Sequence, residues 1–301
     1  MIEVVDAMDR QVRLARPAER VVSLVPSETA SVADLAGVER LVGRTDYCVE
    51  PLGEVETIRS VGGTKSFDVA AVQALRPDLV LANKEENSRP LVQALMSAGL
   101  AVHVSFPCTV DESLGYLDSL GLLLGVDADD SALVMKCRTA VKRTRREHRS
   151  TAVPVFVPIW KDPWMTFDGR AYASDVLEIC GAHNVFSGRP RLYPLAADLG
   201  KTRPRTGQKV DARDTRYPRI RLEEVIERGA RAVLLPDEPY AFSEDDATAF
   251  QELDVSPSLL VEPVDGKDLF WYGTRVAGAV ARIRDQVERL RSVCFGGYPN
   301  N

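Results

Sequence analysis

Residues 75–87 have the sequence LRPDLVLANKEEN, and residues 228–240, RGARAVLLPDEPY, repeat their pattern. Each stretch contains a helix end, then a run of apolar residues, then an acidic tip with turn-forming residues. Short apolar runs bounded by turn signals are typical of buried strands. The repetition therefore predicts that the chain contains two versions of one structural unit.

Strands alternate with helices on both sides of these two stretches. Apolar runs predict strands at residues 20–26, 40–45, 78–83, 101–107, 152–160, 230–236 and 259–265. Helical periodicity, with an N-cap at Ser27 and a glycine stop at Gly37, predicts helices at residues 27–37, 67–75, 88–99, 173–181, 222–229, 243–253 and 272–293. Residues 4–14 predict a hairpin, and residues 200–220 a long surface loop. This alternation predicts an α/β fold with mainly parallel sheets.

The spacing of apolar residues predicts one unbroken helix from Asp127 to Arg149, between the two halves. Acidic residues lie at its start and cationic residues near its end, an arrangement that complements the helix dipole. At a rise of about 1.5 Å per residue, this helix is roughly 35 Å long. We therefore predict an N-terminal α/β lobe (1–126), a connecting backbone helix (127–150) and a C-terminal α/β lobe (151–301).

The composition is that of a globular protein, with 301 residues of which 45% are hydrophobic and 27% charged. The formal net charge of −6 argues against a nucleic-acid partner, and we expect the basic run at residues 142–149 to be a solvated helix face. No stretch approaches the roughly 20 apolar residues of a membrane-spanning helix. Residues 1–27 lack the features of an export signal, so the sequence as written predicts a cytoplasmic protein.

The cysteines and histidines do not show metal-binding spacing. The five cysteines include no CxxC pair: Cys48, Cys108, Cys137, Cys180 and Cys294. Their odd number predicts reduced, mostly buried thiols, with one or two disulfides as the alternative. We interpret the three histidines, His103, His148 and His183, as structural or surface residues. The sequence predicts no metal held by protein side chains.

Polar and aromatic residues follow the predicted strands, where ligands bind in open parallel sheets. The candidate ligand-binding residues of the first half are Ser27, Tyr47, Asn83 and Lys84. Those of the second half are Trp160, Lys161, Trp164, Tyr240, Trp271, Tyr272 and Arg275. Rings of this kind predict a flat, partly apolar ligand with hydrogen-bonding edges. For any single ring, packing in the core is an equally good interpretation.

Four stretches resemble the substrate-binding proteins of metal-chelate ABC importers: residues 20–51, 58–87, 164–186 and 270–283. These helical-backbone metal receptors handle cobalamin, haem and iron–siderophore complexes, and the sequence is most similar to the cobalamin-binding branch. The resemblance implies two Rossmann-like lobes joined by one long backbone helix, with a metal chelate bound in the cleft between them. It also implies a monomer that needs no cofactor and delivers its ligand to an ABC permease.

By position, the resemblance implies that Ser27, Tyr47, Asn83, Trp160, Trp164 and Trp271 contact the ligand. Glu85, Glu86 and Glu244 are the candidate residues for docking to the permease. The sequence departs from the family in having Arg89 where docking relatives often have a glutamate. It also shows no signal peptide or lipobox cysteine, and an extracytoplasmic protein is expected if the true start lies upstream.

Two other hypotheses stay open. An enzyme on the same scaffold could use Lys161, Asp162, Glu238 or Arg275 on a small anionic substrate, or the paired carboxylates Glu85-Glu86 and Asp237-Glu238 as an acid and a base. An intracellular sensor or carrier of the same ligand would have a protein partner but no permease. Cobalamin, haem and ferric siderophores all fit the candidate residues.

Overall fold

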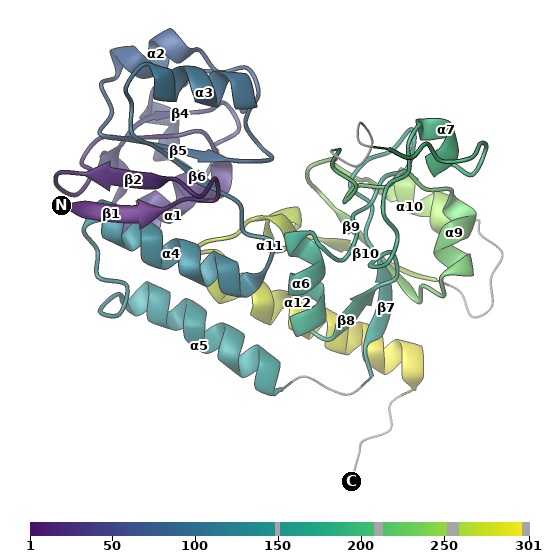
Figure 1. Ribbon diagram of the computed structural model, residues 1–301. Coiled ribbons are helices and arrows are strands. Elements are labelled where there is room, and N and C mark those ends of the chain that lie inside the picture. Colours follow the sequence, from purple (N-terminus) through teal and green to yellow (C-terminus); the bar gives the residue numbers. More distant parts are fainter. Residues whose placement is uncertain (148–150, 208–212, 252–258, 297–301) are drawn as a thin grey trace. The chain divides into compact units, whose positions relative to one another are not determined.

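The computed structural model describes residues 1–147, 151–207, 213–251 and 259–296. The chain divides into two compact units (Figure 1). The first unit contains residues 1–139 and 271–277, and the second contains residues 140–270 and 278–301. Each unit has a four-stranded sheet in which all neighbouring strands are parallel. The predicted α/β fold with two mainly parallel sheets is confirmed.

The sheet of the first unit has the strand order β4–β3–β5–β6. Its strands are β4 (Leu41–Arg44), β3 (Val21–Ser23), β5 (Leu79–Asn83) and β6 (Val102–Ser105). All five residues of β5 are buried, which explains why its sequence is a continuous apolar run rather than an alternation. The predicted hairpin is also present, as β1 (Ile2–Val5) paired with β2 (Gln11–Leu14) in antiparallel register.

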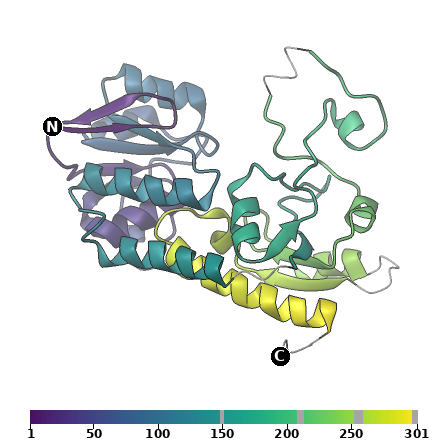
Figure 2. The ribbon, with the colours of Figure 1, turned by 60° about the horizontal axis from the view of Figure 1, so that its bottom comes forward.

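Helices cover both faces of this sheet. They are α1 (Pro26–Ala36), α2 (Val69–Ala74), α3 (Arg89–Ser97) and α4 (Val110–Leu124), with short 3-10 helices at Val38–Arg40 and Val55–Thr57. In Figures 1 and 2, α2 and α3 lie on one face, and α1 and α4 on the other. Val72 of α2 and Leu95 of α3 pack with Val80 of β5 in the core, and burial of such side chains is the main favourable term in folding.

Helix α1 begins one residue before the predicted N-cap. Its N-cap is Val25, whose side chain makes no capping hydrogen bond, and Pro26 occupies the first helical turn. Proline suits this position because its φ is already helical and its missing N–H has no partner to lose. The prediction of Ser27 as the N-cap is therefore wrong, and Ser27 lies buried within the helix.

Helix α5 (Ala132–Arg146) is shorter than the predicted helix over 127–149. Its predicted acidic start forms a turn instead, in which the Asp127 carboxylate accepts the Asp129 N–H at 2.9 Å. Aspartates stabilise such turns because their side chains compete for backbone donors. His148 and Arg149 lie outside the described residues.

The sheet of the second unit has the strand order β10–β9–β7–β8. Its strands are β10 (Leu260–Val264), β9 (Ala232–Pro236), β7 (Val153–Phe156) and β8 (Ala182–Asn184). Its helices are α6 (Tyr172–Ile179), α7 (Leu195–Asp198), α9 (Leu222–Glu227), α10 (Glu244–Gln251), α11 (Gly266–Phe270) and α12 (Val276–Phe295). Phe156, Phe186 and Phe250 fill its core. The sequence did not predict β8, whose three residues, Ala182–Asn184, are not part of an apolar run.

All five cysteines lie in the described part of the chain, and none of them forms a disulfide. Cys48, Cys137 and Cys180 are buried, and burial raises the pKa of each thiol. The prediction of mostly buried thiols is confirmed. Within the described residues, no helix has both the length and the apolar character that a membrane span requires.

Candidate ligand-binding residues

The strand ends of the second unit carry an aromatic pair in which Trp160 is exposed and Tyr240 half-buried. Trp160 follows β7 and Tyr240 follows β9, and their rings meet edge to face with 5.4 Å between centroids. A backbone bridge between Trp160 and Met165 closes the turn that presents the indole. Trp160 remains 47% exposed. The pair therefore offers an aromatic surface of defined orientation to solvent.

A row of rings connects this pair to the core of the second unit. The ring centroids of Tyr240 and Phe242 are 4.7 Å apart. The Phe242 ring stacks on the Trp164 ring, with 5.8 Å between centroids and an interplanar angle of 5°. Trp164 in turn meets Phe250, a fully buried core residue, edge-on at 5.0 Å. The sequence allowed two interpretations of each ring, ligand contact and packing in the core. Trp164 packs on the core and at the same time contacts the ring of Phe242, which leads to Tyr240 and Trp160.

Lys161 contacts both the Trp164 ring and the carboxylate of Asp246. Its Nζ donates to Asp246 at 2.5 Å and lies 5.9 Å from the centroid of the Trp164 ring. Burial by itself would raise the pKa of Asp246, but hydrogen bonds from Lys161 and Ser243 hold that pKa below its ordinary value. The hydrogen bond to Asp246 raises the pKa of Lys161. Lys161 is therefore a cation engaged in an ion pair, which does not suit it to act as a base.

The strand ends of the first unit carry a buried polar network instead. The Tyr272 hydroxyl donates to Glu28 Oε1 at 2.7 Å, and the Ser105 hydroxyl donates to the same oxygen at 2.5 Å. The Asn83 amide donates to Tyr272 Oη at 3.1 Å and to Ser105 Oγ at 3.2 Å. The Tyr116 ring meets the Tyr272 ring edge-on at 5.3 Å. All of these side chains are buried.

Glu28 is the chemically unusual member of this network. It is completely buried, and that burial raises the pKa of its carboxyl group from 4.5 to about 8, although the hydrogen bonds from Ser105 and Tyr272 act in the opposite direction. The carboxyl group is therefore protonated at neutral pH. Its Oε2 atom has no hydrogen-bond partner among the described residues.

Trp271 and Tyr272 belong to the first unit, although the sequence placed them with the aromatic residues of the second half. The segment that follows them is tied to the first unit, because the Gly273 N–H donates to Ser113 Oγ at 2.8 Å and the Thr274 hydroxyl to Asp34 at 2.6 Å. Trp271 and Tyr272 are only 7% and 6% exposed. Their grouping with the candidate residues of the second half is therefore wrong, and their role in ligand binding stays a prediction.

The remaining predicted residues of the first unit differ in exposure. Ser27 and Asn83 are each 5% exposed, so both belong to the interior. Tyr47 is 63% exposed, and Lys84 is exposed with its Nζ 5.1 Å from the Phe106 ring. Arg275 pairs with Glu50 at 3.3 Å and lies over the Trp271 ring. Of this set, Tyr47 and Lys84 are the ones that a ligand in solution can reach.

The candidate docking glutamates lie at two element ends. Glu85 and Glu86 follow β5, where Asn83 Oδ1 accepts both of their backbone N–H groups at 2.8 and 3.2 Å. Glu86 is exposed, Glu85 is half-buried, and Glu244 is exposed in the first turn of α10. Arg89 is exposed as the first residue of α3. Their role in docking stays a prediction.

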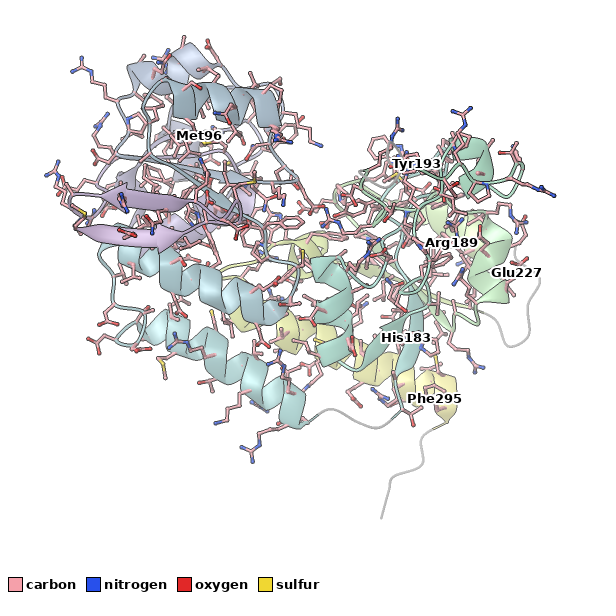
Figure 3. The ribbon with its side chains drawn as sticks, in the orientation of Figure 1. Met96, His183, Arg189, Tyr193, Glu227 and Phe295 are labelled. Carbon is pink, nitrogen blue, oxygen red and sulfur yellow. The ribbon has the colours of Figure 1, made fainter. Side chains whose placement is uncertain are left out.

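The histidines have separate environments. His103 is buried in β6, and burial lowers its pKa to about 4, so that its ring is neutral. His183 is exposed on β8 (Figure 3), and His148 lies outside the described residues. Among the described histidines, cysteines and carboxylates, no group of three or more is placed to hold a metal ion.

Comparison with known proteins identifies the family. Residues 21–215 match the model of the periplasmic binding protein family. A vitamin B12-binding protein of Yersinia pestis (strain Pestoides F) is 29% identical over 175 residues, which cover 58% of this chain and 62% of that protein. The match thus spans less than two thirds of the curated relatives' own length.

Solved structures share the fold at low sequence identity. The periplasmic haem-binding protein RhuT of Roseiflexus sp. RS-1 superposes with a TM-score of 0.71 at 14% identity, covering 91% of this chain and 99% of that one. The vitamin B12-binding protein BtuF of Vibrio cholerae gives a TM-score of 0.67 at 18% identity, covering 91% and 98%. The family model covers more than half of the sequence, and the chain therefore belongs to the periplasmic binding protein family.

Proposed function

We propose that this chain binds a metal chelate, of the corrinoid, haem or ferric siderophore class, as the substrate-binding component of an ABC importer. The observation that carries the proposal is the exposed Trp160 ring, held edge-on against Tyr240 at the carboxyl ends of the second unit's strands. Large, flat ligands gain affinity from such rings because the rings supply apolar area at little cost in conformational entropy. The B12-binding relative and the haem-binding structural neighbour support the ligand class.

Tryptophan fluorescence tests the proposal directly. Cobalamin, haem and a ferric siderophore are titrated separately into the protein, and we expect one of them to quench the emission at micromolar concentration. Trp160→Ala should weaken that binding by about tenfold or more, the effect of removing a central aromatic contact. Because this variant removes a fluorophore, its affinity is measured by calorimetry. Absence of binding by all three chelates would contradict the proposal.

Leu195→Ala is the matched control for Trp160→Ala. Leu195 is 46% exposed and also belongs to the second unit, but it lies on α7, away from the aromatic row in the sequence. We expect the affinity of the Leu195 variant to equal that of the unmodified protein. Trp160→Phe keeps an aromatic ring and should retain most of the affinity. An equal loss in all three variants would argue against a specific role for the ring.

Members of this family are binding proteins, and the absence of catalysis in this chain is part of our proposal. Lys161, the first residue of the enzyme hypothesis, supports this choice because it is held in an ion pair with Asp246. The metal is part of the ligand, and we propose that the protein needs no cofactor of its own. Turnover of a small anionic substrate that is lost in Lys161→Ala would reverse this conclusion.

An ABC permease is the proposed partner, reached outside the cytoplasmic membrane. The support is the exposure of Glu86 and Glu244, one in each unit. The double variant Glu86→Lys, Glu244→Lys should bind the chelate normally and lose association with the reconstituted permease. Glu178→Lys changes an exposed glutamate on α6 and serves as the control. Fractionation of a tagged full-length protein tests the compartment, and a cytosolic location would favour the carrier hypothesis.

A further inference from the structure

The segment from Arg189 to Arg221 concentrates positive charge on an acidic protein. Its described cationic residues are Arg189, Arg191, Lys201, Arg203, Arg205, Arg213, Arg216, Arg219 and Arg221. Its described acidic residues are Asp198 and Asp214. The chain as a whole has a net charge of −6. A concentration of this kind needs either internal neutralisation or an anionic partner.

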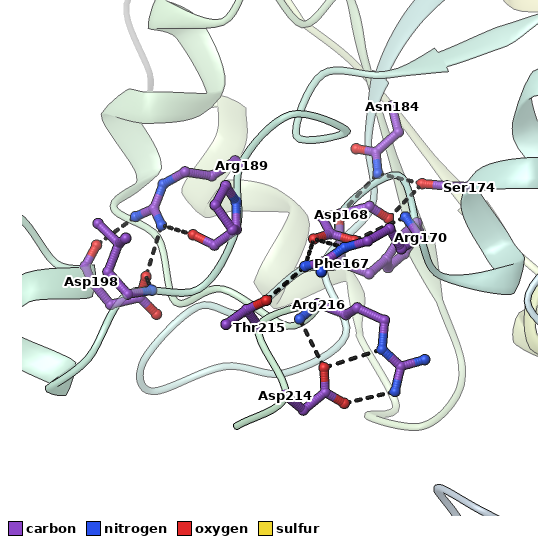
Figure 4. A network of polar contacts seen from close by, with 12 residues as sticks. Phe167, Asp168, Arg170, Ser174, Asn184, Arg189, Asp198, Asp214, Thr215 and Arg216 are labelled. Atoms are coloured by element: carbon purple, nitrogen blue, oxygen red, sulfur yellow. Dashed lines mark hydrogen bonds and ion pairs between the residues drawn. The ribbon is translucent and has the colours of Figure 1, made fainter. Parts of the chain in front are cut away.

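Internal neutralisation accounts for three of these arginines. Arg221 pairs with Glu223 at 3.8 Å and with Glu227 at 3.7 Å. Arg189 donates to Asp198 at 2.7 Å, and Arg216 pairs with Asp214 at 2.7 Å (Figure 4). Arg189 also donates to Glu224 at 3.3 Å. Asp198 is 1% exposed and also accepts the backbone N–H groups of Leu192 and Arg219. These hydrogen bonds hold the backbone at Leu192 and at Arg219 against Asp198.

Arg191, Arg213 and Arg219 have no carboxylate partner within the described part of the chain. Arg191 Cζ lies 4.5 Å and Arg213 Cζ 4.9 Å from the centroid of the Tyr193 ring, which Figure 3 labels together with Arg189. Burial lowers the pKa of Arg219, and the positive charge of Arg191 lowers it further. Arg191 Nε is buried without a hydrogen-bond partner. Arg191 and Arg219 are half-buried, whereas Arg213 is exposed. Half-buried like charges carry an electrostatic cost that an anion would remove.

We infer that Arg191, Arg213 and Arg219 form a binding site for a carboxylate or phosphate group of a small molecule. Guanidinium groups bind these anions through paired N–H donors, and stacking on Tyr193 orients two of the three. The site depends on these residues alone and not on the proposed chelate binding. Such a group is either a free anion or an acidic substituent of a larger ligand.

Backbone hydrogen bonds place this site on a segment that flanks the aromatic row. The Ile220 N–H donates to the Trp164 carbonyl at 2.9 Å, and the Thr166 N–H to the Pro218 carbonyl at 3.1 Å. Arg219 itself forms a backbone bridge with Met165. Arg219 and Trp164 therefore belong to adjacent, paired stretches of the second unit.

Calorimetry at low ionic strength tests the site with citrate and inorganic phosphate as probes. We expect the unmodified protein to bind at least one of them more tightly than acetate. Arg191→Ala combined with Arg219→Ala should lose about tenfold or more of that affinity, because charge-assisted hydrogen bonds disappear. Arg191→Lys keeps the charge without the planar fork and should also bind more weakly. Thermal unfolding checks that each variant is folded.

Arg216→Ala is the matched control, since it removes one positive charge from the same segment but a charge already paired with Asp214. We expect its anion affinity to stay within about twofold of the unmodified value. Equal losses of anion affinity in Arg216→Ala and in the double variant, or unchanged binding in the double variant, would overturn the inference. Citrate and phosphate that bind no better than acetate would overturn it as well.

Two further measurements identify the source of the anion. Trp160→Ala should leave citrate or phosphate binding unchanged, which separates this site from the proposed chelate surface. Haem carries carboxylates, and a loss of haem affinity in the arginine double variant would assign the site to a ligand substituent. Anion binding without any effect on chelate affinity would assign it to a free anion. Both results support the site, whereas a loss of anion binding in Trp160→Ala would contradict its independence.

Discussion

The two units use the same edge of the same kind of sheet in different ways. In the first unit, the last residues of β5 and β6, Asn83 and Ser105, are enclosed in hydrogen bonds with Glu28 and Tyr272. In the second unit, the residues after β7 and β9 form an aromatic pair that stays open to solvent. The difference shows that a position at a strand end does not by itself make a ligand contact. A side chain at a strand end is available to a ligand only if it is not already buried and hydrogen-bonded by another segment of the chain.

The largest expected effect is a change in the free energy of unfolding with pH, caused by the titration of Glu28. Its folded pKa of about 8 lies above its ordinary value of 4.5, so the stability that this group contributes is complete below pH 4.5. That contribution falls as the pH rises, and the loss is complete above pH 8. At ~1.36 kcal/mol per unit, the difference amounts to about 5 kcal/mol. Urea unfolding at pH 5 and pH 9 measures it.

Glu28→Gln isolates this contribution from that of other titrating groups. The amide keeps the size of the side chain and cannot ionise, so we expect the variant to lose much less stability between pH 5 and pH 9. Its free energy of unfolding at pH 9 should exceed that of the unmodified protein. Equal pH dependence in both proteins would show that Glu28 does not carry the buried proton.

The aromatic row of the second unit should owe its stability to Phe250, the buried residue at its inner end. Phe250 is 1% exposed and contacts both Phe156 and Trp164. Phe250→Ala removes this side chain and leaves a cavity, which should lower the free energy of unfolding by about 3–5 kcal/mol. Denaturant unfolding measures the loss, and the Trp164 environment can be followed by fluorescence. A loss below about 1 kcal/mol would mean that the row is not anchored in the core.

The stability of the buried polar network in the first unit should depend on the single hydroxyl group of Tyr272. Tyr272→Phe keeps the ring and its contact with Tyr116 but removes the donor to Glu28 Oε1 and the acceptor for Asn83. Each of these buried groups keeps its hydrogen bond with Ser105 and loses the one with Tyr272, which should cost about 1–3 kcal/mol in total. Tyr240→Phe is the control in the second unit, where the ring is only half-buried. Similar costs in both variants would remove the contrast between the units.

The sequence was sufficient for most of the fold because local patterns determine it. Buried parallel strands such as β5 and β9 are continuous apolar runs, and both were predicted. The three-residue strand β8 was missed because it forms through its pairing with β7 rather than through its own composition. The start of α1 was misplaced because Pro26, not a capping side chain, determines it.

The candidate residues were harder to predict, because they depend on contacts between distant parts of the chain. Glu28 is in the first turn of α1, where an acidic residue normally indicates an exposed helix start. Its partner Tyr272 lies 244 residues away in the sequence, and no local pattern reveals that contact. Trp160 and Tyr240 come after β7 and β9, whose apolar runs are recognisable in the sequence, and their contact with a ligand stays a prediction.

Trp160 should give the smallest effect on stability, and that small effect is what the proposed function requires. Trp160→Ala should change the free energy of unfolding by about 0.5 kcal/mol or less, as is usual for exposed positions. Trp164→Ala, one ring closer to the core, should cost about 2–4 kcal/mol, because it removes the stack on Phe242 and the contact with Phe250. Urea unfolding of the two variants side by side measures both. If Trp160→Ala costs as much as Trp164→Ala, the indole is part of the core and the open aromatic surface of the second unit does not exist.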